Sequence, residues 1–268
     1  MDQLHGKLQA LRSYFAGKSS VAVAFSGGVD STLLLAVAHE VLGCNAIALT
    51  ATSPLHPARE SNEACDFCTD RGIKQIIVES REFEIEGFTH NPPDRCYMCK
   101  KSLFSTFLQR ACEHGVECVV EGSNVDDGSD YRPGARAVAE LGIESPLALC
   151  GLTKTEIRTL SREMNLPTWD KQSFACLASR FAYGDELTPD RLKMVDAAEQ
   201  VLLDEGFKQV RVRFQGTTAR IELPPDQFPH LMRSDVRMRI VDRIKETGFS
   251  YVSLDLQGYR TGSMNETL

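Results

Sequence analysis

Short apolar segments alternate with longer amphipathic stretches along the first two thirds of the chain. The apolar segments are rich in valine, isoleucine and alanine, and the stretches between them are long enough for helices. Segments that stay apolar throughout are typical of parallel strands buried on both faces. The four predicted strands are 21–25, 46–50, 75–78 and 118–120. This pattern predicts an α/β fold built on a doubly wound parallel sheet.

The pattern changes after residue 183. Thr188 and Pro189 suit an N-cap and a first helical position, so they predict the start of a helix that ends before Gly206. The next segments alternate apolar and charged side chains, which predicts a hairpin with one solvated face. The expected elements are a helix at 189–205, strands at 210–214 and 219–223, a helix near 227–247 and a strand at 251–256.

The change of pattern predicts two domains. Residues 1–183 are expected to form the α/β domain, and residues 184–268 a smaller α+β domain that serves substrate binding or oligomerisation. A chain of 268 residues with 42% hydrophobic content can bury a core in each.

The composition of the chain indicates where the protein is located in the cell and which kinds of partner it binds. No run approaches the roughly 18 apolar residues of a membrane helix, and the first residues lack the pattern of a secretory signal. A net charge of −7 gives no broad positive surface for nucleic acid. We therefore expect a cytoplasmic protein with neither membrane nor nucleic-acid partners. Its nine cysteines are an odd number, and in a reducing compartment they predict metal ligands, redox pairs or core residues rather than disulfides.

A glycine-containing hexapeptide follows the first predicted strand and opens a helical stretch that reaches Leu42. Its residues are Ser26, Gly27, Gly28, Val29, Asp30 and Ser31. The glycines let backbone N–H groups approach an anion closely, and the helix N-terminus adds unpaired donors. The lysine of a Walker loop is missing. The hexapeptide instead resembles the PP-loop of ATP pyrophosphatases, which implies that it holds the pyrophosphate of ATP while AMP is left on the activated acceptor.

Ligands of doubly wound sheets lie beyond the carboxyl ends of the strands, so the segments after the other strands are candidates too. Thr52 and Gly122 follow the second and fourth strands. Asp30 would repel phosphate unless a cation lay between them, which predicts Mg²⁺. Asp127, with its neighbour Asp126, is a further candidate ligand, although an ordinary acidic loop is an equal alternative.

Lys154 stands at the start of a predicted helix. Thr153 and Glu156 have the spacing of a capping box, which by itself predicts only a helix start. Similar Lys-x-Glu-Ile-Arg helices occur in PP-loop enzymes, and this resemblance implies that Lys154 reaches the phosphates. Arg132 is a weaker candidate.

Cys96 and Cys99 have C-x-x-C spacing at the start of a predicted helix. A lone pair of this kind fits a redox dithiol, a zinc half-site or an iron–sulfur half-site, so a third partner decides. Cys176 is the candidate third thiol. Three cysteines without a fourth would leave one iron of a 4Fe-4S cluster open to a non-protein ligand, whereas zinc is more often closed by four ligands. A second C-x-x-C pair, Cys65 and Cys68, lies on a predicted helix and is more readily explained by core packing.

Several segments together resemble the LarE family over nearly the whole chain. They are 26–31, 130–134, Cys176 with 179–181, 210–214, 219–223 and 254–268. The resemblance implies an ATP-dependent sulfurtransferase that adenylates pyridinium biscarboxylic acid mononucleotide, releases pyrophosphate and forms a thiocarboxylate for the nickel-pincer cofactor of lactate racemase. One form of the family sacrifices the sulfur of a single cysteine. Cys96 and Cys99 are typical of the second form, in which three cysteines hold a 4Fe-4S cluster that carries sulfide.

The resemblance also assigns residues to a substrate with a phosphate and carboxylates. Arg211 and Arg213 share one face of the predicted hairpin, where a solvated polar face is the simpler explanation from composition alone. The implied anion contacts are Arg180, Arg211, Arg213 and Arg260, and the implied ligands of a further divalent ion are Glu199, Glu222 and Asp235. We also expect a homo-oligomer and a sulfide or other sulfur donor as partner.

Three other functions fit parts of this pattern. A tRNA thiolase of the same superfamily would pair a PP-loop with cysteines, but it normally needs a basic surface or an RNA module. An ammonia-using amide synthetase would leave the cysteines incidental. A nucleotide-sensing module would bind ATP without turnover.

Overall fold

The computed structural model describes residues 2–129, 133–172 and 175–260. The chain forms two compact units, which we describe separately. Unit 1 consists of Met1–Phe88 and Pro93–Phe174, and unit 2 of Thr89–Pro92 and Ala175–Leu268. The predicted boundary between independent domains after residue 183 stays a prediction.

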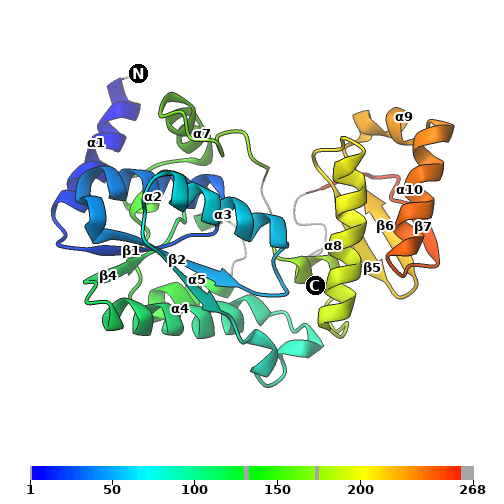
Figure 1. Cartoon of the computed structure of the whole chain (residues 1–268), viewed down its shortest axis with the longest axis horizontal. Helices are drawn as coiled ribbons and strands as arrows, with labels where there is room; N and C mark the ends of the chain where they lie inside the picture. The colour runs from blue at the N-terminus through cyan, green and yellow to red at the C-terminus, as the bar shows by residue number, and fades with distance from the viewer. Residues whose placement is uncertain (1, 130–132, 173–174, 261–268) are drawn as a thin grey trace. The chain divides into compact units, whose positions relative to one another are not determined.

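Unit 1 is a parallel four-stranded sheet with helices on both faces, as the apolar segments predict (Figure 1). The strand order is β3-β2-β1-β4, with β1 paired to both β2 and β4 in parallel. The doubly wound fold is therefore confirmed. Its strands and helices are α1 (Asp2–Ala16), β1 (Val21–Ala24), α2 (Val29–Leu42), β2 (Ala46–Thr52), α3 (Ala58–Asp70), β3 (Gln75–Glu79), α4 (Arg95–Glu113), β4 (Cys118–Val120), α5 (Pro133–Glu140), α6 (Pro146–Leu149) and α7 (Lys154–Glu163).

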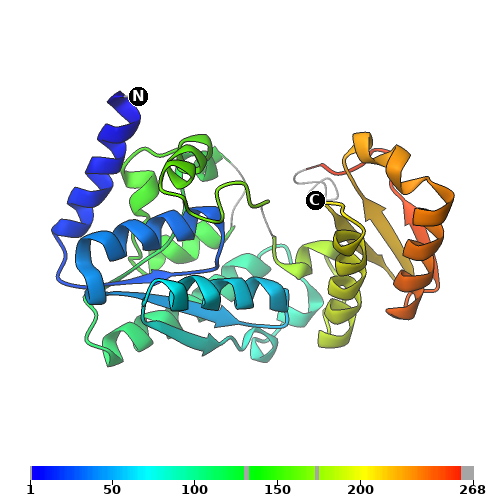
Figure 2. The same ribbon diagram turned by 45° about the horizontal axis from the view of Figure 1, so that its top comes forward.

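Successive residues of the central strands feed two separate cores. Val21 and Val23 of β1 pack in a cluster with residues of α1, α2, α3 and α7. Ala22, the residue between them, packs in a second cluster with residues of α4 and α5. Neighbouring side chains on a strand point to opposite faces, so a run that is apolar at every position is what a sheet covered on both faces requires. Figure 2 shows the same sheet between its helices.

Unit 2 is a three-stranded mixed sheet with helices. Strands β5 (Arg211–Gln215) and β6 (Thr218–Glu222) form the predicted antiparallel hairpin, and β7 (Tyr251–Leu254) pairs with β6 in parallel. The helices are η5 (Leu177–Arg180), α8 (Pro189–Asp204), α9 (Phe228–Leu231) and α10 (Ser234–Glu246). The single helix predicted near 227–247 is thus two helices, because Arg233 has extended backbone angles of −58° and 132°.

The prediction of a solvated face on the hairpin is wrong. Arg211, Arg213 and Glu222 are only 5%, 9% and 1% exposed. Arg213 donates to the carbonyl of Ser179 in η5 over 2.6 Å, and the Arg211 guanidinium lies 5.3 Å from the centre of the Tyr259 ring. Alternation correctly separates polar from apolar faces, but it does not distinguish a wet polar face from one covered by ion pairs.

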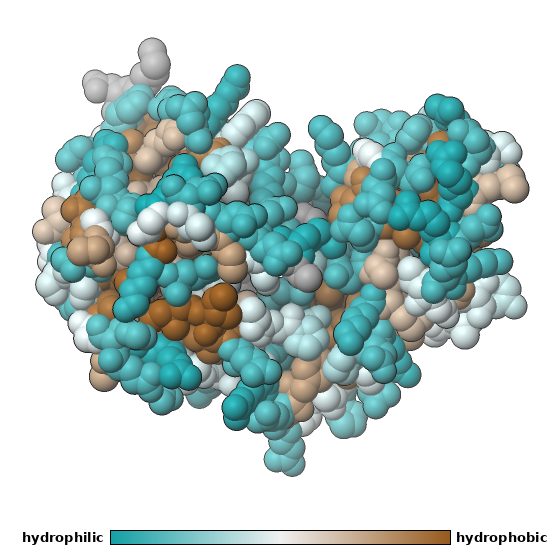
Figure 3. All heavy atoms as spheres, in the orientation of Figure 1, coloured by the Kyte–Doolittle hydropathy of each residue, from teal (hydrophilic) through white to brown (hydrophobic). Residues whose placement is uncertain are grey.

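The face of the molecule that Figure 3 shows is mainly polar. Hydrophilic side chains cover most of it, and hydrophobic ones gather there in small patches. No helix among the described residues combines the length and the apolar character needed to cross a membrane.

The packing of α2 can be tested with a pair of leucine truncations. Leu34→Ala removes a fully buried side chain from the larger core, whereas Leu149→Ala removes one that is 66% exposed. Because a buried truncation loses transfer free energy and leaves a cavity, we expect Leu34→Ala to lower the free energy of unfolding by about 2–5 kcal/mol. Urea denaturation measures this change. An equal loss from Leu149→Ala would contradict the described core.

Candidate functional site

The hexapeptide forms a tight turn between β1 and α2. Gly27 has φ +70°, and a Cβ at this position would lie 3.2 Å from the Cβ of Ala64 in α3, so conformation and space both favour glycine. The Ser31 hydroxyl accepts from the Ser26 N–H at 3.4 Å and donates to the Gly28 carbonyl at 3.2 Å. Gly28 caps α2 without a side chain. The first-turn N–H groups of α2, which have no carbonyl partners within the helix, are therefore available to an anion.

The end of β4 lies directly against this turn. A Cβ on Gly122 would come within 3.1 Å of the Ser31 nitrogen and 3.4 Å of the Asp30 Cβ. The predicted approach of the segments after β1 and β4 is thus present in the structure, and it is close enough to favour glycine at residue 122. Thr52 ends β2 at the same edge of the sheet, where its carbonyl accepts from the Ser80 N–H at 2.9 Å.

Asp30 and Lys154, separated by 124 residues in sequence, form an ion pair beside the turn. The other oxygen of Asp30 accepts from the Asn124 side-chain amide at 3.3 Å. Lys154 begins α7, and the predicted Thr153–Glu156 capping box is present. The structure therefore brings an acidic and a basic side chain to the mouth of the loop, where both can meet a metal-bound phosphate.

The two aspartates after β4 bind backbone groups. Asp127 accepts from the Asn124 N–H at 3.0 Å, and Asp126 accepts from the Lys154 N–H at 2.8 Å. They thus shape the loop η4 (Val125–Ser129) and the start of α7. Asn124, which touches Asp30, belongs to the segment after the fourth strand that is expected to line the crevice, although the sequence alone gives it no individual role. Arg132 lies outside the described residues.

Lys171 is a second residue that the sequence did not reveal. Its ammonium lies 3.0 Å from the Gly27 carbonyl oxygen, across 144 residues of sequence. No motif marks Lys171, because the contact depends on how the segment after α7 returns to the loop.

The thiols of Cys96 and Cys99 lie near the start of α4, where Cys96 is exposed and Cys99 half-buried. Cys176 is the half-buried residue that precedes η5 in unit 2, whereas Cys96 and Cys99 belong to unit 1. Within the described ranges, no three His, Cys, Asp or Glu side chains gather to hold a metal ion. The three-cysteine cluster therefore stays a prediction.

Cys68 differs from these thiols because it belongs to the core. It is 1% exposed within the larger cluster of unit 1, and burial raises its pKa to about 12, with a smaller contribution from Cys65. A protonated, packed thiol is a poor metal ligand, because metals bind the thiolate.

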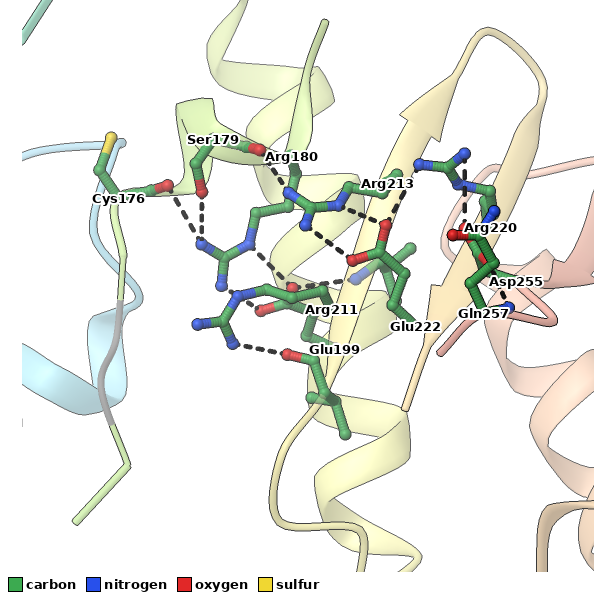
Figure 4. A network of polar contacts seen from close by, with 12 residues as sticks. Cys176, Ser179, Arg180, Glu199, Arg211, Arg213, Arg220, Glu222, Asp255 and Gln257 are labelled. Carbon is green, nitrogen blue, oxygen red and sulfur yellow. Dashed lines mark hydrogen bonds and ion pairs between the residues drawn. The ribbon is translucent and has the colours of Figure 1, made fainter. Parts of the chain in front are cut away.

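A buried network of arginines and carboxylates occupies unit 2 (Figure 4). The Arg180 guanidinium donates to both oxygens of Glu199 over 2.9 and 2.8 Å, and neither side chain is exposed. A third nitrogen of Arg180 donates to the Cys176 carbonyl at 3.1 Å and to the Ser179 hydroxyl at 3.0 Å. Arg180 therefore fixes the backbone on which Cys176 stands.

The hairpin contributes the other half of this network. Arg213 donates to both oxygens of Glu222 at 2.9 and 2.7 Å, and Arg220 donates to Glu222 at 3.1 Å. Arg220 also lies 3.6 Å from Asp255. Burial and the nearby Arg180 charge lower the pKa of Arg211. The carboxylates of this network, Glu199, Glu222 and Asp255, each lie within ion-pair distance of an arginine.

Several residues that the resemblance assigns to anions or a divalent ion lie in this network, and these assignments stay predictions. Glu199 and Glu222 have both oxygens bonded to guanidinium groups, and Glu199 also accepts from the Val212 N–H at 3.0 Å. Asp235 lies in the first turn of α10 beside Arg233 and Arg239, at 3.4 and 3.5 Å. Arg180 is an internal residue, and Arg260 ends the described part of unit 2.

Comparisons with known proteins agree with this geometry. The chain is 39% identical to the pyridinium-3,5-bisthiocarboxylic acid mononucleotide synthase of Lactiplantibacillus plantarum, over 92% of this chain and 90% of that one. It is 42% identical over 99% of both chains to an uncharacterised protein of Synechocystis. A component of the glutamine-hydrolysing GMP synthase of Thermoplasma volcanium is 26% identical over 72% of this chain and 65% of that one. No protein-family profile matches the chain.

The chain is an ATP-dependent enzyme of the PP-loop class. This follows from the parallel sheet that leads into the glycine turn and from the similarity to the mononucleotide synthase and to the GMP synthase component. Within that class, the chain belongs to the LarE-like family of ATP pyrophosphatases.

The buried pair of Arg180 and Glu199 gives a prediction for stability. Glu199→Gln leaves the Arg180 charge buried without its counter-ion, so we expect the free energy of unfolding of unit 2 to fall by about 3–5 kcal/mol. Asp235→Asn is the matched control, because the Asp235 side chain is 54% exposed, and we expect it to cost less than about 0.5 kcal/mol. Urea unfolding of both variants measures the difference. Equal losses would contradict a special role for the buried pair.

The environments of the cysteines predict their reactivity. Iodoacetamide at about pH 8 is expected to label Cys96 and the exposed Cys44 faster than Cys68, because Cys68 is buried and protonated. Peptide mass spectrometry of briefly labelled native protein provides the measurement. Labelling of Cys68 at the rate of Cys44 would show that it is not the core residue described here.

Proposed function

We propose that this protein is a sulfurtransferase that converts a carboxylate of pyridinium biscarboxylic acid mononucleotide to a thiocarboxylate, at the expense of ATP. The observation that carries the proposal is the 39% identity, over 92% of this chain, to the synthase of the bisthiocarboxylic acid mononucleotide. The product would serve the nickel-pincer cofactor of lactate racemase, as the LarE resemblance implies.

The first step of the proposed reaction is adenylation. A carboxylate oxygen of the substrate attacks the α-phosphorus of ATP, and pyrophosphate leaves with the electron pair of the broken P–O bond. The backbone N–H groups at the start of α2 would hold the leaving pyrophosphate, and Lys154 would neutralise part of its charge. Thr52 and Gly122 line the same edge of the sheet.

The residues around the loop fit a magnesium ion. Asp30 is a carboxylate beside an anion-binding turn, and its side chain remains 23% exposed next to Lys154. Oxygen ligands and phosphate together suit Mg²⁺, which usually takes one or two carboxylates. Asp30 would hold the ion, with Asp127 as a second carboxylate that now accepts from a backbone N–H.

The cysteines fit the donor set of a 4Fe-4S cluster. Cys96 and Cys99 are three residues apart on one helix, so their side chains share a face, and neither belongs to the described core clusters. Together with Cys176 they provide three thiolates, the ligand type of such clusters. A cluster held in this way would leave one iron for an external sulfide and so supply the sulfur for transfer.

The second step would replace AMP by sulfur. A hydrosulfide sulfur would attack the carbonyl carbon of the acyl-adenylate, AMP would leave with the electron pair of its C–O bond, and the proton of the hydrosulfide would pass to solvent. In this scheme Cys176 stays a ligand and keeps its own sulfur. The contact of Arg180 with the Cys176 carbonyl would hold that residue in place during the exchange.

The arginines of unit 2 suit the anionic substrate. Guanidinium groups bind phosphate and carboxylate groups through paired hydrogen bonds, so arginines gathered on the hairpin suit a ligand that carries both. We propose Arg211, Arg213 and Arg260 as contributors to this site, with Arg180 as their internal support.

The mass of the protein after catalysis tests the sulfur source. Anaerobic protein is incubated with ATP, Mg²⁺, sulfide and the pyridinium acid until many thiocarboxylates have formed per chain, and its intact mass is then measured. We expect no change, because the transferred sulfur comes from outside the chain. A loss of about 34 mass units, which is one H₂S from a cysteine, would show that Cys176 is consumed.

Cysteine variants separate the cluster from the rest of the proposal. Cys96→Ser should abolish bound iron and sulfide and stop repeated turnover, whereas Cys44→Ser, at another exposed cysteine, should leave both unchanged. Iron that is still bound by Cys96→Ser would exclude this ligand set. Tight binding of tRNA by the wild type would instead favour the tRNA thiolase.

A further inference from the structure

The segment that follows α7 returns to the phosphate loop through one lysine. We call residues 166–172 the return segment. The Lys171 side chain is only 13% exposed, and its ammonium lies 3.0 Å from the Gly27 carbonyl oxygen. The same ammonium lies 2.6 Å from an oxygen of Glu60 and 2.6 Å from an oxygen of Glu63, both in the first turns of α3. One cation therefore ties the return segment, the loop and α3 together.

Side chains of α7 hold the return segment in place, and with it Lys171. Arg158 donates to the carbonyls of Trp169 and Lys171 at 2.8 and 2.7 Å. The guanidinium of Arg162 lies 5.1 Å from the centre of the Trp169 ring. The Lys171 N–H donates to the Thr168 carbonyl at 3.0 Å. These contacts aim the side chain of Lys171 at the loop.

The contact with the Gly27 carbonyl determines which way the peptide group between Gly27 and Gly28 faces. In a trans peptide the carbonyl and the following N–H point in opposite directions. A carbonyl of Gly27 held by Lys171 therefore turns the N–H of Gly28 to the opposite side. The peptide between Gly27 and Gly28 joins two glycines, which rotate more freely than other residues, so an external contact is needed to fix it.

Lys171 acts through the loop rather than on the phosphates. An ammonium has three N–H donors, and the Gly27 carbonyl, Glu60 and Glu63 provide three acceptors for them. The two carboxylates also offset its charge. Lys154, whose only described carboxylate partner is Asp30, is the cation suited to meet the phosphates directly.

We propose that Lys171 is a positioning residue for ATP: it holds the Gly27 carbonyl so that the Gly28 N–H faces the pyrophosphate moiety. This role depends only on the use of ATP by the enzyme. It does not depend on which acid the enzyme activates. Loss of Lys171 should weaken ligands that carry a pyrophosphate group more than ligands that lack it.

Calorimetric titrations of the full-length protein with inorganic pyrophosphate and with AMP, both with Mg²⁺, test this role. For Lys171→Met we expect pyrophosphate affinity to fall about tenfold, the effect of one hydrogen bond to a charged group, and AMP affinity to change by no more than about twofold. Lys171→Arg retains a cationic donor and should recover part of the pyrophosphate affinity. Lys18→Met is the matched control, because it removes an ion pair with Glu144 at 2.9 Å elsewhere in unit 1, and it should bind both ligands like the wild type.

Glu63→Gln distinguishes the proposed role from a tether of α3. The Glu63 side chain is 57% exposed, and its loss leaves the contact with Gly27 in place. We therefore expect Glu63→Gln to bind pyrophosphate within about twofold of the wild type. Unchanged pyrophosphate affinity in Lys171→Met would overturn the proposal, as would equal losses in Lys171→Met and Glu63→Gln. If Lys171→Met does not fold, Lys171→Arg and Glu63→Gln still test the proposal. Pyrophosphate affinities that are equal in these two variants, and well below that of the wild type, would refute it.

Discussion

The first turn of α2 leaves backbone N–H groups without carbonyl partners, and unit 1 is arranged around this requirement. Gly27 adopts a positive φ against Ala64, and Gly122 brings the end of β4 within contact of Ser31. A Cβ at either glycine would make contacts of 3.1–3.2 Å, so its neighbours would have to shift by a few tenths of an ångström. The strand order places β1 between β2 and β4, so the turn opens at the edge where a doubly wound sheet binds its ligand. The contacts that pack the strands and helices of unit 1 together thus also form the anion-binding turn.

Unit 2 differs from unit 1 because it buries charged side chains as arginine–glutamate ion pairs. The pairs of Arg180 with Glu199 and of Arg213 with Glu222 each use two hydrogen bonds. A buried ion pair of this kind adds little to stability compared with an apolar core, but removing one partner is costly. The arrangement therefore specifies geometry more than it stabilises the fold. One product of that geometry is a fixed backbone at Cys176.

Local patterns along the chain predicted local structure well. The four parallel strands, the Thr188 cap, the capping box at Thr153 and the hairpin follow from periodicity and from side-chain chemistry within a few residues. The glycine turn was predictable for the same reason, because its strand, its glycines and its helix are consecutive.

Contacts between distant segments were not predictable in this way. Lys171 reaches Gly27 across 144 residues, and Asn124 reaches Asp30 across 94. The burial of Arg211 and Arg213 depends on η5 and on Tyr259, which are remote from the hairpin in sequence. A charged side chain in an alternating strand has the same pattern whether water or another charge covers it, so only the tertiary structure separates the two cases.

These features support one account, in which the loop at the start of α2 receives the pyrophosphate of ATP and the enzyme leaves AMP on an acid. The bond of ATP that is broken tests this account most directly. Product analysis by phosphorus NMR, with the pyridinium acid as acceptor and sulfide present to displace AMP, should find AMP and pyrophosphate in equal amounts. Formation of ADP and phosphate would contradict the account, because it would mean that the loop serves a different cleavage.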